Sequence, residues 1–130
     1  MSEENEDLVS VRYVVDDVQA AIDFYTGHFG FVVRSAHLPA FADVTRGRLR
    51  LLLSGPQSSG ARATPADADS AGRNRIHLIV EDLDAEIARL QAAGGVVPRS
   101  EVISGPGGRQ VLVADPAGNL VELFTPAPPA

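Results

Sequence analysis

The stretch RQVLVADPAGNLVELF, residues 109–124, decides the fold of this chain. Two apolar runs flank the segment Asp115-Pro116-Ala117-Gly118-Asn119. Proline fixes φ at a turn position, and glycine and asparagine accept positive φ, so the segment predicts a turn between two antiparallel strands. We therefore interpret residues 109–124 as a β-hairpin.

Glu122 is the unusual residue of this hairpin. Side chains alternate between the two faces of a strand, so Glu122 shares a face with Leu120 and Phe124, while Val121 and Leu123 point the other way. Both faces are otherwise apolar, and a carboxylate in such surroundings needs a metal, a cation, a ligand or water. An edge strand from which Glu122 reaches solvent also fits the pattern. Both interpretations are open at this point.

The composition narrows the class of protein. The chain has 130 residues, of which 45% are hydrophobic, as is typical of one globular domain. Its net charge of −6 argues against a nucleic-acid partner, and no segment is apolar and long enough to span a membrane. The absence of cysteine excludes disulfides and thiolate zinc sites. Residues 1–7 are acidic, unlike a signal peptide, so we expect a mobile tail and a soluble, cytoplasmic protein with no membrane partner.

The rest of the chain predicts the same order of elements twice. In the first half Asp17 is the N-cap of a helix that ends by Gly27 or Gly30. Strands are predicted before and after it, at 8–15, 31–37, 41–45 and 49–53. Residues 54–74 are rich in glycine, serine, alanine, proline and aspartate, and predict a flexible connector. In the second half Asp82 is the N-cap of a helix that ends at 94–95, with strands near 75–80, 96–103, 109–114 and 120–125.

The two halves also align in sequence. VDDV at 15–18 matches VEDL at 80–83, and GRLRL at 47–51 matches GNLVE at 118–122. One βαβββ module leaves one face of its small sheet uncovered, so we expect two modules to enclose a cavity, the default ligand site. The expected fold is an α+β domain at 8–125, with modules at 8–53 and 75–125 and a tail at 126–130. Its modules form a cupped mixed β-sheet with the helices outside.

With these motifs, and with DFY at 23–25 and FGF at 29–31, the chain resembles the vicinal oxygen chelate superfamily. That superfamily includes glyoxalase I, extradiol dioxygenases, fosfomycin resistance enzymes and bleomycin-binding proteins. The resemblance covers about residues 8–125 and is specific for the fold, whereas the reaction must be argued from the site.

The resemblance also implies positions for metal ligands. Enzymes of the superfamily hold a divalent metal with residues from the first and last strands of each module, and here these positions are Ser10, Leu51, Arg75 and Glu122. Leucine has no donor atom and arginine repels a cation, so only Glu122 fits. We expect no tightly bound metal and no other cofactor. A divalent metal held by Glu122 and His77 is the disfavoured alternative.

The neighbours of these positions complete the candidate site. Strand alternation places His77 on the face of Arg75, and Arg12 on the face of Ser10. His77 is interpreted as a neutral core or cavity histidine, with ligation as the alternative, and Arg75 either pairs with Glu122 alone or also contacts a ligand. The candidate ligand-binding residues are Ser10, Arg12, Leu51, Arg75, His77 and Glu122. The arginines beside the predicted turn are expected to be solvated, and they are Arg46, Arg48 and Arg50.

Three functions are compatible with this pattern. The favoured one is a metal-free protein that binds a small, partly apolar molecule, as the drug-sequestering branch of the superfamily does. The second is an enzyme: a metal-dependent lyase, isomerase or dioxygenase with atypical ligands, or a metal-free catalyst that uses His77 and Glu122 as acid and base. The third is an accessory domain without a small ligand. Because the resemblance implies paired modules and often paired chains, we expect a homodimer.

Overall fold

The structure, a computed structural model, describes residues 8–65 and 74–128. The chain forms two compact units, residues 1–69 and 70–130, and each is described by itself. The division falls inside the segment expected as a connector. The acidic tail expected at 1–7 lies outside the described residues, as do residues 66–73 of the connector and the last two residues of the chain.

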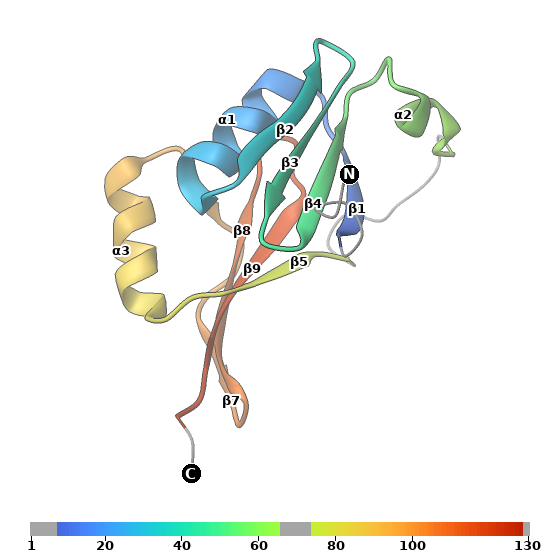
Figure 1. The fold of residues 1–130 in the computed structure, drawn as a ribbon. Coiled ribbons are helices and arrows are strands. Elements are labelled where there is room, and N and C mark those ends of the chain that lie inside the picture. Colours follow the sequence, from blue (N-terminus) through green and yellow to red (C-terminus); the bar gives the residue numbers. More distant parts are fainter. Residues whose placement is uncertain (1–7, 66–73, 129–130) are drawn as a thin grey trace. The chain divides into compact units, whose positions relative to one another are not determined.

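The first unit has the predicted order of a strand, a helix and three strands. Its elements are β1 (Val9–Val14), α1 (Val18–Phe29), β2 (Val32–His37), β3 (Phe41–Arg46), β4 (Leu49–Ser54) and α2 (Ser59–Ala63). The strand order is β1-β4-β3-β2, with β1 parallel to β4 and the other pairs antiparallel (Figure 1). Helix α2 lies within the segment expected as an irregular connector. It begins at the N-cap Ser58, whose Oγ accepts a hydrogen bond from the backbone N–H of Ala61.

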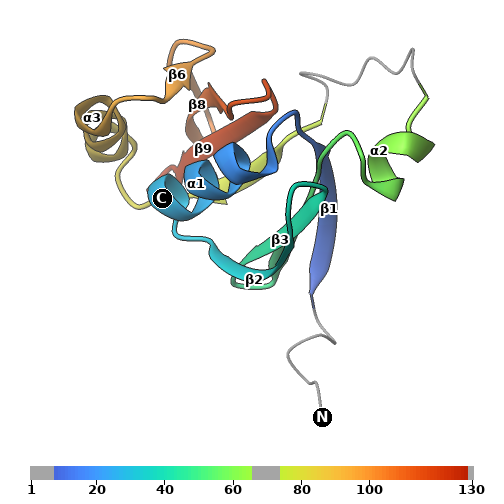
Figure 2. The same ribbon diagram turned by 90° about the horizontal axis from the view of Figure 1, so that it is seen from above.

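Helix α1 covers one face of this sheet, and its ends are set by two predicted residues. The Asp17 side chain accepts a hydrogen bond from the N–H of Ala20 at the N-cap. At the other end Gly30 has a φ of 72°, a left-handed conformation that glycine adopts without steric cost. Between them the apolar side of α1 packs against β2, β3 and β4. Figure 2 shows α1 from above, beside β2 and β3. Its buried residues are Val18, Ala21, Ile22, Phe24, Tyr25 and Phe29.

The second unit repeats this topology. Its elements are β5 (Ile76–Ile79), α3 (Leu83–Ala93), β6 (Val97–Pro98), β7 (Ile103–Gly105), β8 (Gly108–Ala114) and β9 (Leu120–Pro126). The strand order is β5-β9-β8-β6, with β7 also paired to β8, and β5 is parallel to β9. The prediction of a single strand near 96–103 is wrong, because this region forms two short strands, β6 and β7. The expected tail also starts later, since Pro126 ends β9 and the N–H of Ala127 donates to the carbonyl of Gly107.

The predicted hairpin is confirmed by the antiparallel pairing of β8 and β9. The Asp115 carboxylate organises its turn: Oδ1 accepts hydrogen bonds from the N–H groups of Ala117 at 3.0 Å and Asn119 at 2.7 Å. Strand β9 lies between β5 and β8, so it is a central strand. The edge-strand interpretation of Glu122 is therefore wrong, and the residue is only 8% exposed.

Matching strand orders in the two units confirm the α+β fold of repeated βαβββ modules with mixed sheets. Both parallel pairs join the first and last strands of a module, which places the candidate residues of β1 beside β4 and those of β5 beside β9. None of the helices in the described part of the chain has the length and apolar content needed to cross a bilayer.

Candidate functional site

In the second unit, the site is built around the carboxylate of Glu122. The Nε of Arg75 donates a hydrogen bond to Glu122 Oε1 at 3.0 Å, so the expected ion pair is present. His77 is the register partner of Glu122 across the parallel pair β5–β9, and its Nε2 lies 3.6 Å from Glu122 Oε2. The His77 ring also contacts the Phe124 ring, with centroids 4.8 Å apart. One carboxylate thus has an arginine and a histidine beside its two oxygens.

Exposure decides what this group can do. The Glu122 side chain is 11% exposed, whereas those of Arg75 and His77 are 30% and 45% exposed. His77 is therefore not a core histidine. A half-exposed imidazole next to a carboxylate and an aromatic ring can contact a ligand or exchange a proton with it. Of the sequence-derived set, the structure brings Arg75, His77 and Glu122 together.

The corresponding strands of the first unit carry Ser10 and Arg12. Arg12 Nη1 donates to Ser54 Oγ at 2.8 Å, which ties β1 to the last residue of β4. By register Ser10 lies beside Arg50, and Arg12 lies beside Leu52. Both Ser10 and Arg12 are exposed.

Leu51 does not belong to this face. It is fully buried and in phase with Leu53 of the core. The register partner of Arg12 is Leu52, just as the partner of His77 is Glu122. Aligning the two halves on the glycines of their turns therefore matched Glu122 with Leu51, one residue before its structural equivalent Leu52. A shift of one residue moves a side chain to the opposite face of a strand. The assignment of Leu51 to the ligand-binding set is corrected accordingly.

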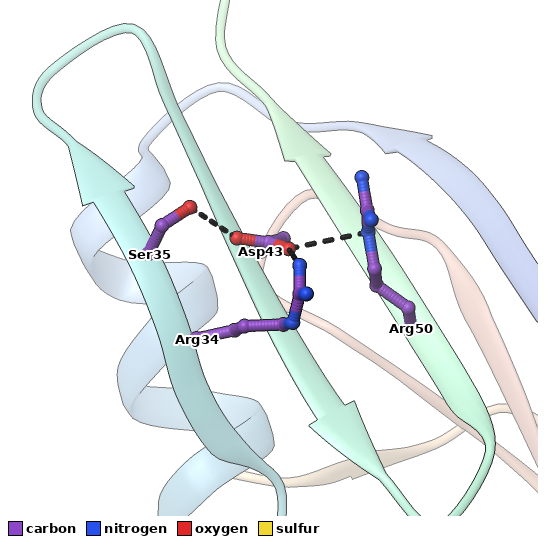
Figure 3. Close-up of polar contacts among 4 residues, drawn as sticks. All are labelled: Arg34, Ser35, Asp43 and Arg50. Atoms are coloured by element: carbon purple, nitrogen blue, oxygen red, sulfur yellow. Dashed lines mark hydrogen bonds and ion pairs between the residues drawn. The ribbon is translucent and has the colours of Figure 1, made fainter. Parts of the chain in front are cut away.

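The sequence interpretation missed another carboxylate buried within a strand, Asp43 of β3, which is 2% exposed (Figure 3). Ser35 Oγ donates a short hydrogen bond to its Oδ1. Arg34 Nη1 lies 3.5 Å from Oδ2, and Arg50 Nε lies 3.2 Å from the same oxygen. The Arg50 contact is an ion pair without hydrogen-bond geometry. The prediction that Arg50 is a solvated turn residue is therefore wrong.

A β-bulge makes this cluster possible. Val33 pairs with Val44 and Ser35 with Asp43, so Arg34 is the extra residue on β2. Both Arg34 and Ser35 therefore reach the same carboxylate. The signal for Asp43 was the one used for Glu122, a carboxylate inside an apolar strand, FADVT at 41–45. The bulge itself has no signature in the sequence.

Next to this cluster the first unit has a pocket of about 460 Å³. Residues of β1 and β4, the start of β3 with the residue before it, and the segment around α2 form its wall: Arg12, Ala40, Phe41, Arg50, Leu52, Gln57, Ser58, Ser59 and Gly60. Two guanidinium groups and two large apolar side chains line the same hollow. Such a wall suits a small molecule that has both an apolar body and a polar group.

Comparison with known proteins places these features in a family. The profile of the Glyoxalase/Bleomycin resistance protein/Dioxygenase superfamily matches residues 7–123. The chain belongs to this superfamily. No curated protein matches its sequence significantly. Two solved structures with about the same sequence identity to this chain belong to proteins of different function. Membership of the superfamily therefore does not by itself specify the activity.

A lactoylglutathione lyase from Agrobacterium tumefaciens is 28% identical, with 92% of this chain and 93% of that chain covered and a TM-score of 0.71. TnmS3, an antibiotic binding protein from Streptomyces sp. CB03234, is 27% identical, with 92% and 95% covered and a TM-score of 0.67. A family enzyme from Burkholderia phytofirmans PsJN is 19% identical, with 93% and 99% covered and a TM-score of 0.75, and shows the fold alone.

Proposed function

We propose that this superfamily member binds a small, partly apolar molecule and does so without a metal ion. One observation carries the proposal: Glu122 accepts a hydrogen bond from Arg75 at 3.0 Å. By resemblance, Glu122 stands at a metal-ligand position. A guanidinium remains charged at every relevant pH and offers a fork of donors to a carboxylate. Arg75 therefore supplies the positive charge that a metal would bring to Glu122.

The residues at the ligand positions do not fit a divalent metal. Leu52, which the strand register makes the equivalent of Glu122, has no donor atom, and Arg75 is a cation bound to the carboxylate. Serine hydroxyls such as that of Ser10 are weak ligands for zinc, which takes thiolate, imidazole or carboxylate. Within residues 8–65 and 74–128, no group of three or more His, Cys, Asp and Glu is arranged to hold a metal ion.

The character of the ligand follows from the side chains that face it. In the second unit His77 and Phe124 offer two rings, 4.8 Å apart, beside the Arg75–Glu122 pair. Rings of this kind suit a flat apolar or aromatic body, and the polar pair suits a hydrogen-bonding group. The antibiotic binding protein TnmS3 among the similar structures agrees with such a role. The ligand cavity expected between the modules stays a prediction.

Metal analysis and ligand capture test the proposal. The protein is purified without chelator, its metal content is measured by plasma mass spectrometry, and native mass spectrometry with a panel of aromatic antibiotics detects bound molecules. We expect metal far below one equivalent, and ligand binding that EDTA does not change. Stoichiometric zinc, nickel, manganese or iron that disappears in Glu122→Ala, but stays in the exposed-site control Glu101→Ala, contradicts the proposal.

A second function is favoured by a specific contact. His77 Nε2 lies 3.6 Å from Glu122 Oε2, which is longer than a hydrogen bond. Catalytic hydrogen bonds are often long before substrate binds, so the two groups are candidates for an acid–base pair. The similar lactoylglutathione lyase agrees with an enzyme. Incubation with S-lactoylglutathione, with and without added divalent metal, separates the two functions. Turnover that His77→Gln abolishes would favour a lyase over a binding protein.

A further inference from the structure

We propose that the pocket of the first unit binds an oxyanion, the carboxylate or phosphate group of a small molecule, through Arg12 and Arg50. This inference rests on the proposed function and deepens it, because it assigns a chemical class to a small molecule that the first unit binds. It concerns the pocket of about 460 Å³ formed by β1, β4, the start of β3 and the segment around α2.

The first argument is the uncompensated charge of Arg12. Its hydrogen-bond partner is a neutral hydroxyl, Ser54 Oγ, at 2.8 Å. No carboxylate lies within ion-pair distance of Arg12 among the residues that the structure describes, in contrast to Arg34 and Arg50, which pair with Asp43. A guanidinium has five N–H donors, and Ser54 uses only one of the nitrogens. Arg12 therefore has donors left at the wall of the pocket.

The second argument is that the fold holds Arg12 in place. A Cβ added at Gly60 would stand 2.2 Å from Arg12 Nη1 and 2.7 Å from its Cζ. Helix α2 can approach the guanidinium this closely only because residue 60 has no side chain. Ser54 fixes the guanidinium from β4 and Gly60 faces it from α2. A preorganised arginine loses less conformational entropy when an anion binds.

The third argument is the local balance of charge. Arg34 and Arg50 share a single carboxylate, Asp43, so this cluster carries one excess positive charge before Arg12 is counted. The chain as a whole carries a net charge of −6, so a positive pocket is opposite in sign to the whole. Figure 3 shows the Arg50 side chain extending along β4 toward the C-terminal end of that strand. Both Arg12 and Arg50 line the pocket.

The rest of the pocket wall indicates what the anion is attached to. Phe41 and Leu52 lie on the same wall as the two arginines. A molecule that fits has an apolar body of drug-like size with one acidic group at its end. Arginine forks suit carboxylate and phosphate equally well, so the two sources are separated by experiment.

Two fluorescent probes of similar shape test the charge requirement with the full chain. One is 8-anilinonaphthalene-1-sulfonate, an apolar anion, and the other is N-phenyl-1-naphthylamine, its neutral analogue. We expect Arg12→Met to weaken the anionic probe roughly ten-fold or more, the loss of one charge-assisted hydrogen bond, and to leave the neutral probe unchanged. Arg62→Met is the matched control, since Arg62 is an exposed residue of α2 outside the pocket wall and its removal changes the net charge equally.

Gly60→Ala is the second variant, because it displaces the Arg12 guanidinium while every charge remains. It should weaken the anionic probe as Arg12→Met does, with circular dichroism showing an intact fold. Competition then names the anion: displacement of the probe by inorganic phosphate or by benzoate assigns the acidic group of the ligand.

Equal binding of the two probes, no effect of either variant, or displacement by neither competitor overturns the oxyanion site. Binding of the neutral probe in those cases leaves the proposed small-molecule binding intact. Stoichiometric metal that is lost in Glu122→Ala, by contrast, overturns the proposed metal-free function. The oxyanion site is then judged from the probe results alone.

Discussion

At the scale of single residues, both modules place a carboxylate inside an apolar strand and neutralise it with arginine. Asp43 is 2% exposed and Glu122 is 8% exposed. A carboxylate at such depth must be paired, because an isolated buried charge is expelled or neutralised. Asp43 has two arginines and a serine hydroxyl, whereas Glu122 has one arginine and a histidine. The two clusters therefore respond differently to the loss of one partner.

Removing Arg75 should destabilise the protein more than removing Arg75 and Glu122 together. Arg75→Met leaves a carboxylate whose remaining neighbour is His77, and we expect a loss of about 2 kcal/mol in the free energy of unfolding, below the value for a fully buried pair because Arg75 is 30% exposed. The double variant Arg75→Met, Glu122→Leu should lose less than half of that. Urea unfolding measures both, and an equal loss in the two proteins contradicts the argument.

The Asp43 cluster should tolerate the loss of either arginine. Arg34→Met leaves Arg50 at 3.2 Å from the carboxylate, and Arg50→Met leaves Arg34 at 3.5 Å. We expect each single change to cost about 1 kcal/mol or less and the double change to cost more than the sum, because only then is the buried carboxylate left without a cation. Urea unfolding of the three variants forms a double-mutant cycle. Additive losses would show that the arginines do not substitute for each other.

At the scale of elements, Asp84 and Arg109 join α3 to β8. Arg109 Nη2 lies 3.0 Å from Asp84 Oδ1, and this hydrogen bond, reinforced by the Coulomb attraction, lowers the pKa of Asp84 below its usual value of 3.8. A carboxyl group whose pKa is depressed in the folded state contributes stability above its unfolded pKa and loses that contribution as the pH falls through the folded pKa. The link between α3 and β8 is therefore weakened only at strongly acidic pH.

Removing Arg109 should raise the pKa of Asp84 toward 3.8. The titration of the Asp84 side-chain carboxyl in Arg109→Gln, followed by NMR, measures the change. Arg99→Gln is the control, since Arg99 is not among the groups that shift Asp84. A pKa of Asp84 that is the same in Arg109→Gln and in the unchanged protein would mean that the pair does not form in solution.

The elements themselves were largely predictable from local signals. Asp17 and Asp82 mark the starts of α1 and α3, and the turn at 115–119 marks the hairpin, because caps and turns depend on a few adjacent residues. Helix α2 was missed since its five residues, SGARA, have no apolar periodicity. The missed elements are short, and their stability comes from tertiary packing rather than from local sequence.

The candidate site was predictable only for residues whose strand face follows from the alternation of side chains along a single strand. Alternation placed Arg75, His77 and Glu122 on one face, and the structure agrees. It failed for Leu51, because the choice between Leu51 and Leu52 depends on the register of the parallel pair β1–β4. That register is fixed by contacts between strands about 40 residues apart, as in the partners Arg12 and Leu52, and no local pattern encodes it.

At the scale of the whole molecule, the number of chains in the functional unit depends on how the modules pair. We expect a homodimer, because members of the superfamily pair modules and often pair chains, and a long connector between modules lets them pair within or between chains. The closure entropy of a loop rises only slowly with its length, so the segment at 54–74 adds little cost to either arrangement. Sedimentation equilibrium at tens of micromolar should give twice the chain mass of 13.7 kDa, and dilution should shift the population toward the monomer. A single species of 13.7 kDa across the whole concentration range would rule out the dimer and restrict module pairing to one chain.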